Sequence, residues 1–187
     1  LADISTVCKQ YGMYLFVDGA RMSYGLASGD VTLADLAKYS DVFYIGGTKC
    51  GAMFGEAVVI TNDNLKPDFR SCIKQNGGML AKGWTLGLQF YTLFKDGLYF
   101  DIAKKSIEQA QRIKNAFLNK SIKMYIDSPT NQQFVAVEQE IADILAKDFY
   151  YENEGYTDDG KKIIRFCTAW GTKDQEGDAL VESINKL

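Results

Sequence analysis

Three short, mostly apolar runs constrain the fold of this chain more than any other feature. They lie at residues 13–17, 41–46 and 55–61. A strand with one face in water would alternate polar and apolar residues, whereas a continuous apolar run is typical of a strand buried on both faces. Helical spacing of apolar residues marks the segments 1–12 and 32–39, which alternate with the runs. The sequence therefore predicts an α/β unit with a mostly parallel sheet, covered on both faces.

After residue 61, helical patterns dominate and then give way to a smaller α+β pattern. A helix is expected from about residue 62 to Gly77-Gly78, followed by a long helical stretch from about 79 to 119 that Gly97 divides. The elements expected after it are a strand at 123–126, a turn and strand at 128–138, a helix at 139–147, a hairpin at 149–170 with Asp-Asp-Gly at its turn, and a closing helix at 174–187.

These patterns predict two domains. Residues 1–97 would form the α/β domain, and residues 98–187 would form the small α+β domain.

Composition excludes several classes of partner. The chain has 187 residues, of which 47% are hydrophobic and 24% charged, with a formal net charge of -3. This is typical of a soluble globular protein with a real core. There is no clustered basic run to bind nucleic acid or an anionic membrane, and no apolar stretch reaches the roughly 18 residues that span a bilayer. We therefore expect neither a nucleic-acid nor a membrane partner.

Cysteine and histidine usage narrows the chemistry. The four cysteines form no Cys-x-x-Cys pair and match no zinc spacing, which predicts reduced thiols and a cytoplasmic location. Histidine is absent, so Ser-His-Asp and Cys-His catalysis are excluded and no metal site is predicted. Any catalysis must therefore use Lys, Arg, Asp, Glu, Tyr or a bound cofactor.

Two of the apolar runs end in a charged residue. Asp18 follows the first run in "YLFVDGARMSYG", and Lys49 follows two glycines and a threonine in "DVFYIGGTKCG". Ligands of open α/β sheets bind outside the carboxyl ends of the strands, where both side chains would lie. A lysine in a partly dry pocket has a lowered pKa and can form a Schiff base, and a nearby carboxylate stabilises a cationic ring nitrogen. Those are the two polar anchors that a pyridoxal phosphate (PLP) enzyme requires.

The same two residues also have a purely structural interpretation. A lysine after glycines is commonly a solvated turn residue, and an aspartate at the end of a strand is commonly the N-cap of the next helix. Spacing alone leaves both interpretations open.

Longer segments carry a family resemblance. "LFVDGARMSYGLAS" contains Asp-Gly-Ala-Arg at residues 18–21, and "YSDVFYIGGTKCGAMFGEAVVI" contains Thr48-Lys49 followed by Cys50-Gly51. The similarity continues through "NGGMLAKGWTLGLQF" and "PTNQQFV" to "IIRFCTAW", in order along essentially the whole chain. In these segments the chain resembles the fold-type-I PLP enzymes, in the branch of L-threonine aldolases and β-eliminating lyases. The resemblance implies the C-terminal part of a mostly parallel three-layer sandwich, followed by a small α+β domain.

The resemblance implies which residues would bind the cofactor. Lys49 would form the Schiff base with its aldehyde, and Asp18 would pair with its pyridine nitrogen. The Thr48 hydroxyl would bind the phosphate or cap the turn, and Lys82, with Lys74, would also reach the phosphate.

The substrate residues implied by the resemblance are two arginines. Arg21 and Arg165 would hold the carboxylate of an amino acid, because a planar guanidinium suits bidentate binding. For Arg165, on a predicted strand, a structural salt bridge is the alternative. Cys50, beside the lysine, is expected to be a small buried packing residue rather than a nucleophile.

The chain departs from the family pattern in three places. "CGAMFG" replaces the Ala-Pro step that commonly follows the lysine, and Ala81-Lys82 stand where the family often has an arginine. The Gly-rich phosphate loop and the ring-stacking aromatic or histidine, which precede Asp-Gly-Ala-Arg in the family, are missing. We therefore expect this chain to be the C-terminal half of an enzyme, inactive by itself.

The function implied by the resemblance is a PLP-dependent lyase. It would cleave a β-hydroxy-α-amino acid, such as threonine or allo-threonine, to glycine and an aldehyde, and the complete enzyme would be a homodimer or homotetramer. Two alternatives remain open. One is a PLP-dependent β-eliminating lyase acting on an aromatic or sulfur amino acid, and the other is a non-catalytic α/β binding domain in which Lys49 is structural.

Overall fold

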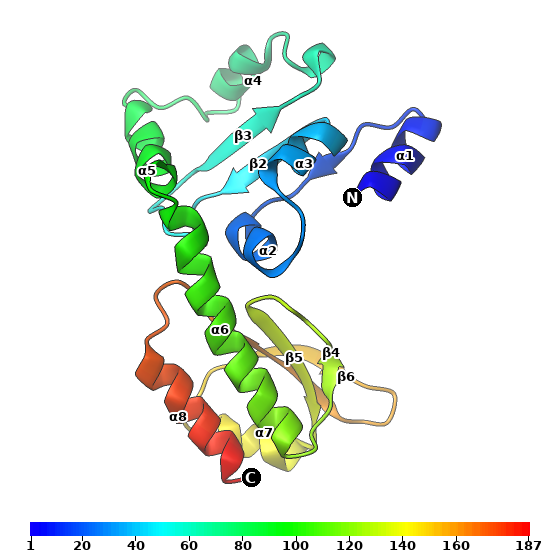
Figure 1. The fold of residues 1–187 in the computed structure, drawn as a ribbon, viewed down its shortest axis with the longest axis vertical. Helices are drawn as coiled ribbons and strands as arrows, with labels where there is room; N and C mark the ends of the chain where they lie inside the picture. The colour runs from blue at the N-terminus through cyan, green and yellow to red at the C-terminus, as the bar shows by residue number, and fades with distance from the viewer. The chain divides into compact units, whose positions relative to one another are not determined.

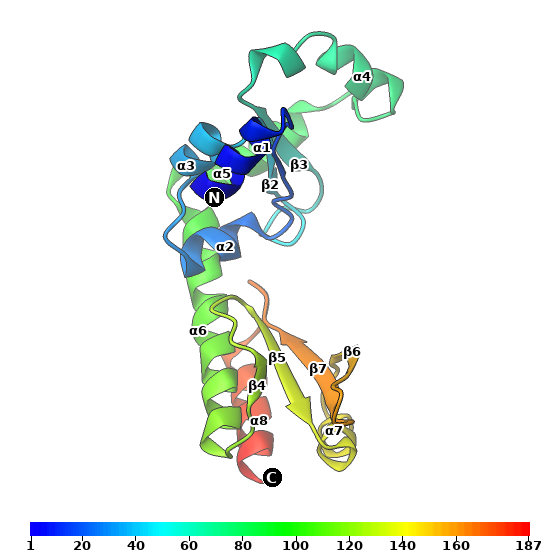
Figure 2. The ribbon, with the colours of Figure 1, turned by 90° about the vertical axis from the view of Figure 1, so that its right-hand side faces the viewer.

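The computed structural model describes all residues from 1 to 187, which form two compact units, Leu1–Asp101 and Ile102–Leu187 (Figures 1 and 2). The predicted domain boundary after residue 97 falls inside the first unit, near its end. None of the helices is both long enough and apolar enough to cross a membrane.

The first unit is a three-stranded sheet, in the order β1-β2-β3, with helices before, between and after its strands. Its elements are α1 (Ala2–Gln10), β1 (Phe16–Val17), α2 (Met22–Ser28), α3 (Leu33–Tyr39), β2 (Val42–Gly46), β3 (Glu56–Ile60), the 3-10 helix η1 (Asp63–Leu65), α4 (Phe69–Gln75) and α5 (Trp84–Lys95).

The two strand pairings of this sheet differ in direction. β1 and β2 are parallel, with Val17 opposite Phe43, so their carboxyl ends lie at the same edge. β3 runs antiparallel to β2. Only residues 47–55 connect β2 with β3, and a parallel crossover needs a dozen or more residues. The α/β class is confirmed, while the third strand departs from the expected parallel direction.

Local hydrogen bonds set the bounds of two elements. α3 begins where predicted because the Thr32 hydroxyl accepts the Asp35 amide (3.2 Å) and the Asp35 carboxylate accepts the Thr32 amide (2.9 Å), a capping box. β1 is shorter than predicted because the Leu15 amide donates to the Asp41 carboxylate (2.8 Å).

The single helix expected from residue 62 is wrong in its first half. The segment forms η1, then a break, and then α4. Pro67 has no amide hydrogen to donate, so a helix that ran through it would lose a hydrogen bond of its backbone. Asp68, which follows it, has a left-handed backbone with φ 59°.

The long helical stretch is divided at Gly97, as predicted, into α5 and α6 (Leu98–Asn119). Gly97 has φ 77°, a conformation that costs glycine little and other residues more. α5 begins at Trp84 rather than near residue 79.

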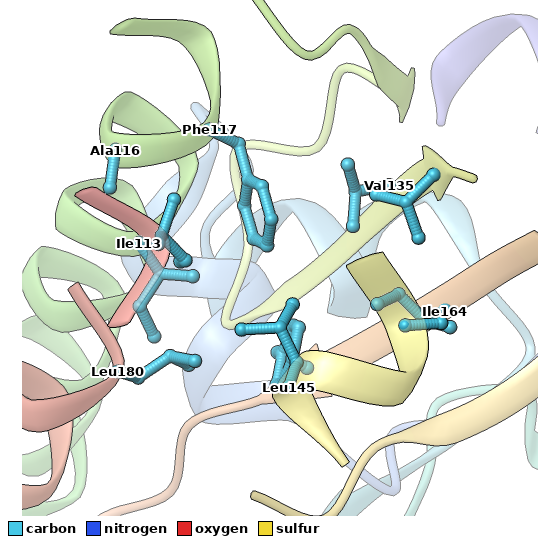
Figure 3. Close-up of a cluster of buried hydrophobic side chains, with 11 residues drawn as sticks. Ile113, Ala116, Phe117, Val135, Leu145, Ile164 and Leu180 are labelled. Atoms are coloured by element: carbon cyan, nitrogen blue, oxygen red, sulfur yellow. The ribbon is translucent and has the colours of Figure 1, made fainter. Parts of the chain in front are cut away.

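The second unit packs helices on one face of an antiparallel sheet, ordered β4-β5-β7-β6. Its elements after α6 are β4 (Met124–Ile126), β5 (Gln132–Val137), α7 (Gln139–Leu145), β6 (Glu152–Tyr156), β7 (Lys162–Cys167) and α8 (Asp174–Asn185). Alternate β5 residues, Val135 and Val137, are buried together with Phe117 of α6, Leu145 of α7 and Ile184 of α8 (Figure 3). This cluster is the core of the unit.

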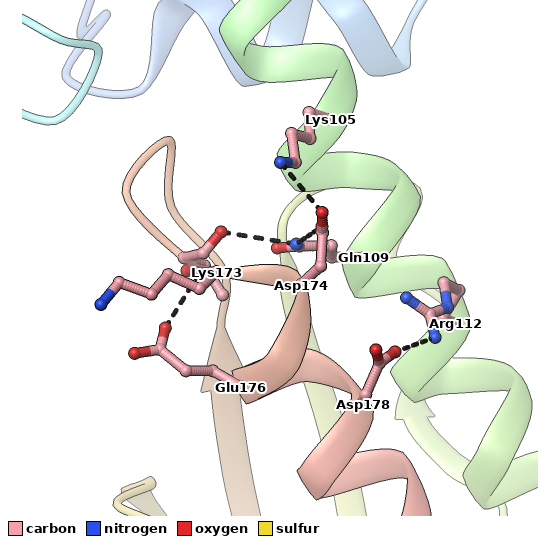
Figure 4. A network of polar contacts seen from close by, with 8 residues as sticks. Lys105, Gln109, Arg112, Lys173, Asp174, Glu176 and Asp178 are labelled. Carbon is pink, nitrogen blue, oxygen red and sulfur yellow. Dashed lines mark hydrogen bonds and ion pairs between the residues drawn. The ribbon is translucent and has the colours of Figure 1, made fainter.

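Polar contacts fasten α8 alongside α6 (Figure 4). The Asp174 carboxylate accepts a hydrogen bond from the Gln109 amide (2.7 Å) and lies 3.2 Å from the Lys105 ammonium. One helical turn further, Arg112 pairs with Asp178. These exposed pairs fix the register of the two helices more than they add stability.

The buried cluster predicts a large difference between two neighbouring residues of α7. Leu145 is fully buried, whereas Ile144 is 45% exposed. Leu145→Ala should lower the free energy of unfolding by about 2–5 kcal/mol, because it leaves a cavity, and Ile144→Ala should change it by less than about 1 kcal/mol. Urea unfolding followed by circular dichroism measures both, and equal losses would contradict the placement of the core.

Candidate active site

Asp18 lies just beyond the end of β1, beside Tyr44 of β2. Because Val17 is opposite Phe43 in the parallel ladder, the next residue of each strand comes side by side. The Tyr44 hydroxyl donates a hydrogen bond to Oδ1 of Asp18. The Ala20 amide donates to the same oxygen at 3.0 Å. Both bonds end on Oδ1, so Oδ2 is left for a ligand.

These contacts keep Asp18 ionised. The hydrogen bond from Tyr44 is the largest influence that lowers the pKa of the Asp18 carboxyl, followed by the amide of Ala20, and the charge of Lys49 adds to them. The same contact raises the pKa of the Tyr44 phenol to about 12.

Lys49 lies on a tight turn between β2 and β3, residues 46–52, which we call the Lys49 turn. The carbonyl of Gly47 accepts the amides of Cys50 (2.9 Å) and Ala52 (3.0 Å), which closes the turn. The amide of Gly47 donates to the Glu56 carboxylate at 2.6 Å. The turn is therefore held from inside and from the first residue of β3.

Two tyrosines anchor the Lys49 turn from the helices. The Tyr24 hydroxyl, from α2, donates to the carbonyl of Lys49 at 2.9 Å. The Tyr99 hydroxyl, from the first turn of α6, donates to the carbonyl of Gly46 at 2.9 Å. Both rings are buried, whereas the Lys49 side chain is exposed. The backbone under Lys49 is thus fixed while its amine is accessible.

The Lys49 turn and the segment after Asp18 touch backbone to backbone. The amide of Gly46 donates to the carbonyl of Gly19 at 2.9 Å. A Cβ on Gly46 would lie 2.4 Å from that carbonyl oxygen, which only glycine avoids. Cys50 is fully buried beside them, with its sulfur 3.9 Å from the carbonyl of Ala20, in keeping with a packing residue.

The other predicted site residues are distributed as follows. Arg21 is half-buried at the residue before α2, so it shares the corner of the first unit that holds Asp18 and Lys49. The Thr48 hydroxyl lies 3.5 Å from a carboxylate oxygen of Glu56. Lys82 is exposed just before α5, and no contact joins it to the other site residues. The roles assigned to these residues stay predictions.

Arg165 lies in the second unit, on β7. Its Nε is 3.0 Å from a carboxylate oxygen of Glu154, and its Nη1 donates to the Gln132 side-chain oxygen at 2.9 Å. The salt bridge that was the structural alternative for Arg165 is therefore present. It does not use the whole guanidinium, so it does not exclude a carboxylate ligand.

The sequence interpretation missed two residues of the candidate site, Tyr44 and Glu56. Tyr44 sits within an apolar run and reads as a core aromatic. Only the ladder register places it beside Asp18, and no motif specifies that register. Glu56 follows Gly55 at the start of a predicted strand. A carboxylate at that position is the only feature of the sequence that indicates a hydrogen bond to the preceding turn.

The Tyr44–Asp18 contact predicts a specific pH dependence. Folding lowers the pKa of the Asp18 carboxyl below 3.8, so the ionised carboxylate stabilises the folded state above that pH, and the stabilisation is lost as pH falls through the folded-state pKa. Tyr44→Phe should raise the folded-state pKa. The difference in unfolding free energy between wild type and Tyr44→Phe should therefore shrink from about pH 6 to about pH 3.

Carbon NMR titration of the Asp18 carboxyl measures the same effect directly. Tyr91→Phe, in an exposed tyrosine of α5, is the matched control and should leave the Asp18 titration unchanged. An Asp18 pKa that is equal in wild type and Tyr44→Phe would refute the assigned cause.

Comparisons with known proteins place the chain in a family. The chain is 29% identical over 180 residues to the low specificity L-threonine aldolase of Pseudomonas sp. (strain NCIMB 10558), covering 93% of this chain and 50% of that protein. The structure of Leishmania major threonine aldolase superposes with a TM-score of 0.94 and 43% identity, over 99% of this chain and 55% of that one. Serine palmitoyltransferase of Sphingomonas wittichii, at 13% identity and a TM-score of 0.67, shares the fold.

The chain thus spans about half the length of the relatives that it matches. A family model described as beta-eliminating lyase matches residues 1–146, which include the Asp18 segment and the Lys49 turn. The chain belongs to the beta-eliminating lyase family, whose threonine aldolases are PLP-dependent enzymes of fold type I.

Proposed function

We propose that the complete protein is a PLP-dependent lyase that cleaves a β-hydroxy-α-amino acid, such as threonine or allo-threonine, into glycine and an aldehyde. The observation that carries the proposal is the pairing at one sheet edge of an ionised carboxylate, Asp18, with an accessible amine, Lys49, whose charge acts on it. The relatives named threonine aldolase support the substrate class.

The donor set of this corner fits PLP. No hydrogen bond or ion pair occupies the Lys49 amine, so it is available to hold the cofactor through its aldehyde. Oδ2 of Asp18 is open and ionised, so it can keep a proton on the pyridine nitrogen. The Thr48 hydroxyl and the Lys82 ammonium would bind the phosphate. Bound PLP supplies an electron sink for the bonds at the substrate Cα.

The arginines would orient the substrate. Arg21 and Arg165 would bind the amino-acid carboxylate, which turns the Cα–Cβ bond into the orientation from which it breaks. Arg21 belongs to the first unit, as do Lys49 and Asp18, whereas Arg165 belongs to the second. The two arginines are paired in this proposal because both can bind a carboxylate.

The context of the complete protein is part of the proposal. We expect a homodimer or homotetramer, as the family resemblance implies. We also expect a cytoplasmic protein, because Cys8, Cys50, Cys72 and Cys167 are all unpaired.

Reductive trapping tests the cofactor. The complete protein would be incubated with PLP, reduced with borohydride and mapped by mass spectrometry. We expect a phosphopyridoxyl group on Lys49 that is lost in Lys49→Ala and kept in Lys66→Ala, a control at an exposed lysine paired with Asp63. Labelling scattered over surface lysines would overturn the proposal and favour a non-catalytic binding domain.

A product assay separates the two enzymatic candidates. The family description as beta-eliminating lyases makes loss of a β-substituent the second candidate. Aldol cleavage of threonine releases glycine and acetaldehyde, whereas β-elimination from an aromatic or sulfur amino acid releases ammonia and a 2-oxo acid. We expect glycine and acetaldehyde from threonine or allo-threonine. Ammonia and a 2-oxo acid from an aromatic or sulfur amino acid, without cleavage of threonine, would favour the second.

A further inference from the structure

Arg165 is held on three sides by residues of the neighbouring strands. Its Nε is 3.0 Å from an oxygen of Glu154, on β6. Its Nη1 donates to Gln132 of β5 at 2.9 Å. The Phe134 ring, directly opposite on β5, lies 5.8 Å from the guanidinium carbon. The side chain is only 25% exposed, so the guanidinium has little freedom to turn.

A β-bulge provides the Glu154 contact. Asn153 is opposite Ile164 and Gly155 is opposite Ile163, which leaves Glu154 as an inserted residue with no partner on β7. A bulge redirects the side chain of its extra residue, and bulges are frequent beside active sites. Glu154 has no partner of its own in the β6–β7 ladder, and its carboxylate lies against the Arg165 guanidinium.

The contacts occupy only part of the guanidinium. A guanidinium has five N–H donors. The Glu154 carboxylate pairs with the guanidinium on the side of Nε, which is buried and makes no hydrogen bond, and Gln132 accepts one hydrogen of Nη1. Both hydrogens of Nη2 and one of Nη1 have no partner in the chain. Two parallel N–H groups are what bidentate carboxylate binding uses. The guanidinium is thus fixed in plane and direction while one edge stays open.

We infer that Glu154 and Gln132 are positioning residues that preorganise Arg165 to bind the carboxylate of the amino-acid substrate. The inference rests on the proposed function, because it takes Arg165 to be a carboxylate-binding residue. Beyond that function, the inference identifies the residues that hold Arg165 in place. It predicts that the affinity for a carboxylate depends on two residues that do not contact the substrate.

Glycine binding to the PLP-loaded complete protein provides the test. Glycine affinity is read from the change in cofactor absorption, with ethylamine as the matched ligand that lacks a carboxylate. Glu154→Ala should weaken glycine by about tenfold or more and leave ethylamine within about threefold. Glu154→Gln, which keeps an acceptor oxygen, should restore most of the affinity. Gln132→Ala should also weaken glycine selectively, and it serves as the second arm if Glu154→Ala does not fold.

Glu152→Ala is the control variant. Glu152 lies on the same strand, opposite Arg165 in the ladder, and carries the same charge without contacting the guanidinium. Its glycine affinity should match wild type. In kinetics with threonine, Glu154→Ala should raise KM more than it lowers kcat. Thermal unfolding checks that each variant is folded.

Three outcomes overturn the inference in distinguishable ways. Suppose that Arg165→Lys lowers the affinity for glycine, but that folded Glu154→Ala and Gln132→Ala leave this affinity unchanged or raise it. Glu154 and Gln132 would then be structural or would only neutralise charge, and only their positioning role would be rejected. If Arg165→Lys leaves glycine affinity unchanged, the proposed carboxylate role of Arg165 falls, and the inference falls with it. Loss of both glycine and ethylamine binding in Glu154→Ala would also overturn it, because the effect would not be specific to the carboxylate.

Discussion

The backbone contact between Gly19 and Gly46 is the constraint on which the candidate active site depends. It joins the segment that follows β1 to the turn that follows β2, with the Gly46 amide 2.9 Å from the Gly19 carbonyl. A Cβ on Gly19 would lie 1.8 Å from the carbonyl oxygen of Tyr44 in β2, and a Cβ on Gly46 would lie 2.4 Å from the carbonyl oxygen of Gly19. Because parallel strands end at the same edge, this contact brings the charged residue after each strand within electrostatic range of the other.

The electrostatics of that corner depend more on hydrogen bonds than on the two charges. Asp18 is exposed, and water and salt screen the attraction between exposed charges. Its pKa is lowered mainly by Tyr44 and the Ala20 amide, with Lys49 as the smallest favourable influence. The lowered pKa of the Asp18 carboxyl therefore depends mainly on these two hydrogen bonds.

The elements of the fold that depend on interactions between residues close in the sequence were predictable. The apolar runs at 41–46 and 55–61, the Thr32 cap and the break at Gly97 all specify their elements through short-range patterns. The direction of β3 depends on the length of its connection to β2, which a pattern of apolar residues does not contain. The helix expected from residue 62 fails at Pro67, a signal that was readable in the sequence.

The charged residues of the candidate site were recognisable from motifs, but the residues around them were not. Asp18, Lys49 and Arg21 stand in short signatures that resemble a known family. Tyr44 acquires its meaning only from the parallel register of β1 and β2. Contacts between strands depend on register, and register is a property of the folded sheet rather than of any segment.

The same dependence on register makes the second unit sensitive to the length of one strand. Each strand residue faces the side opposite to its neighbours, so a shift of one position turns every side chain to the other face. The bulge at Glu154 absorbs one extra residue, which lets Tyr156 pair with Lys162 while Glu152 stays opposite Arg165. Deleting residue 154 would remove the bulge and its carboxylate together. A substitution at 154 keeps the ladder and changes only the contact, so the two effects are physically separable at this position.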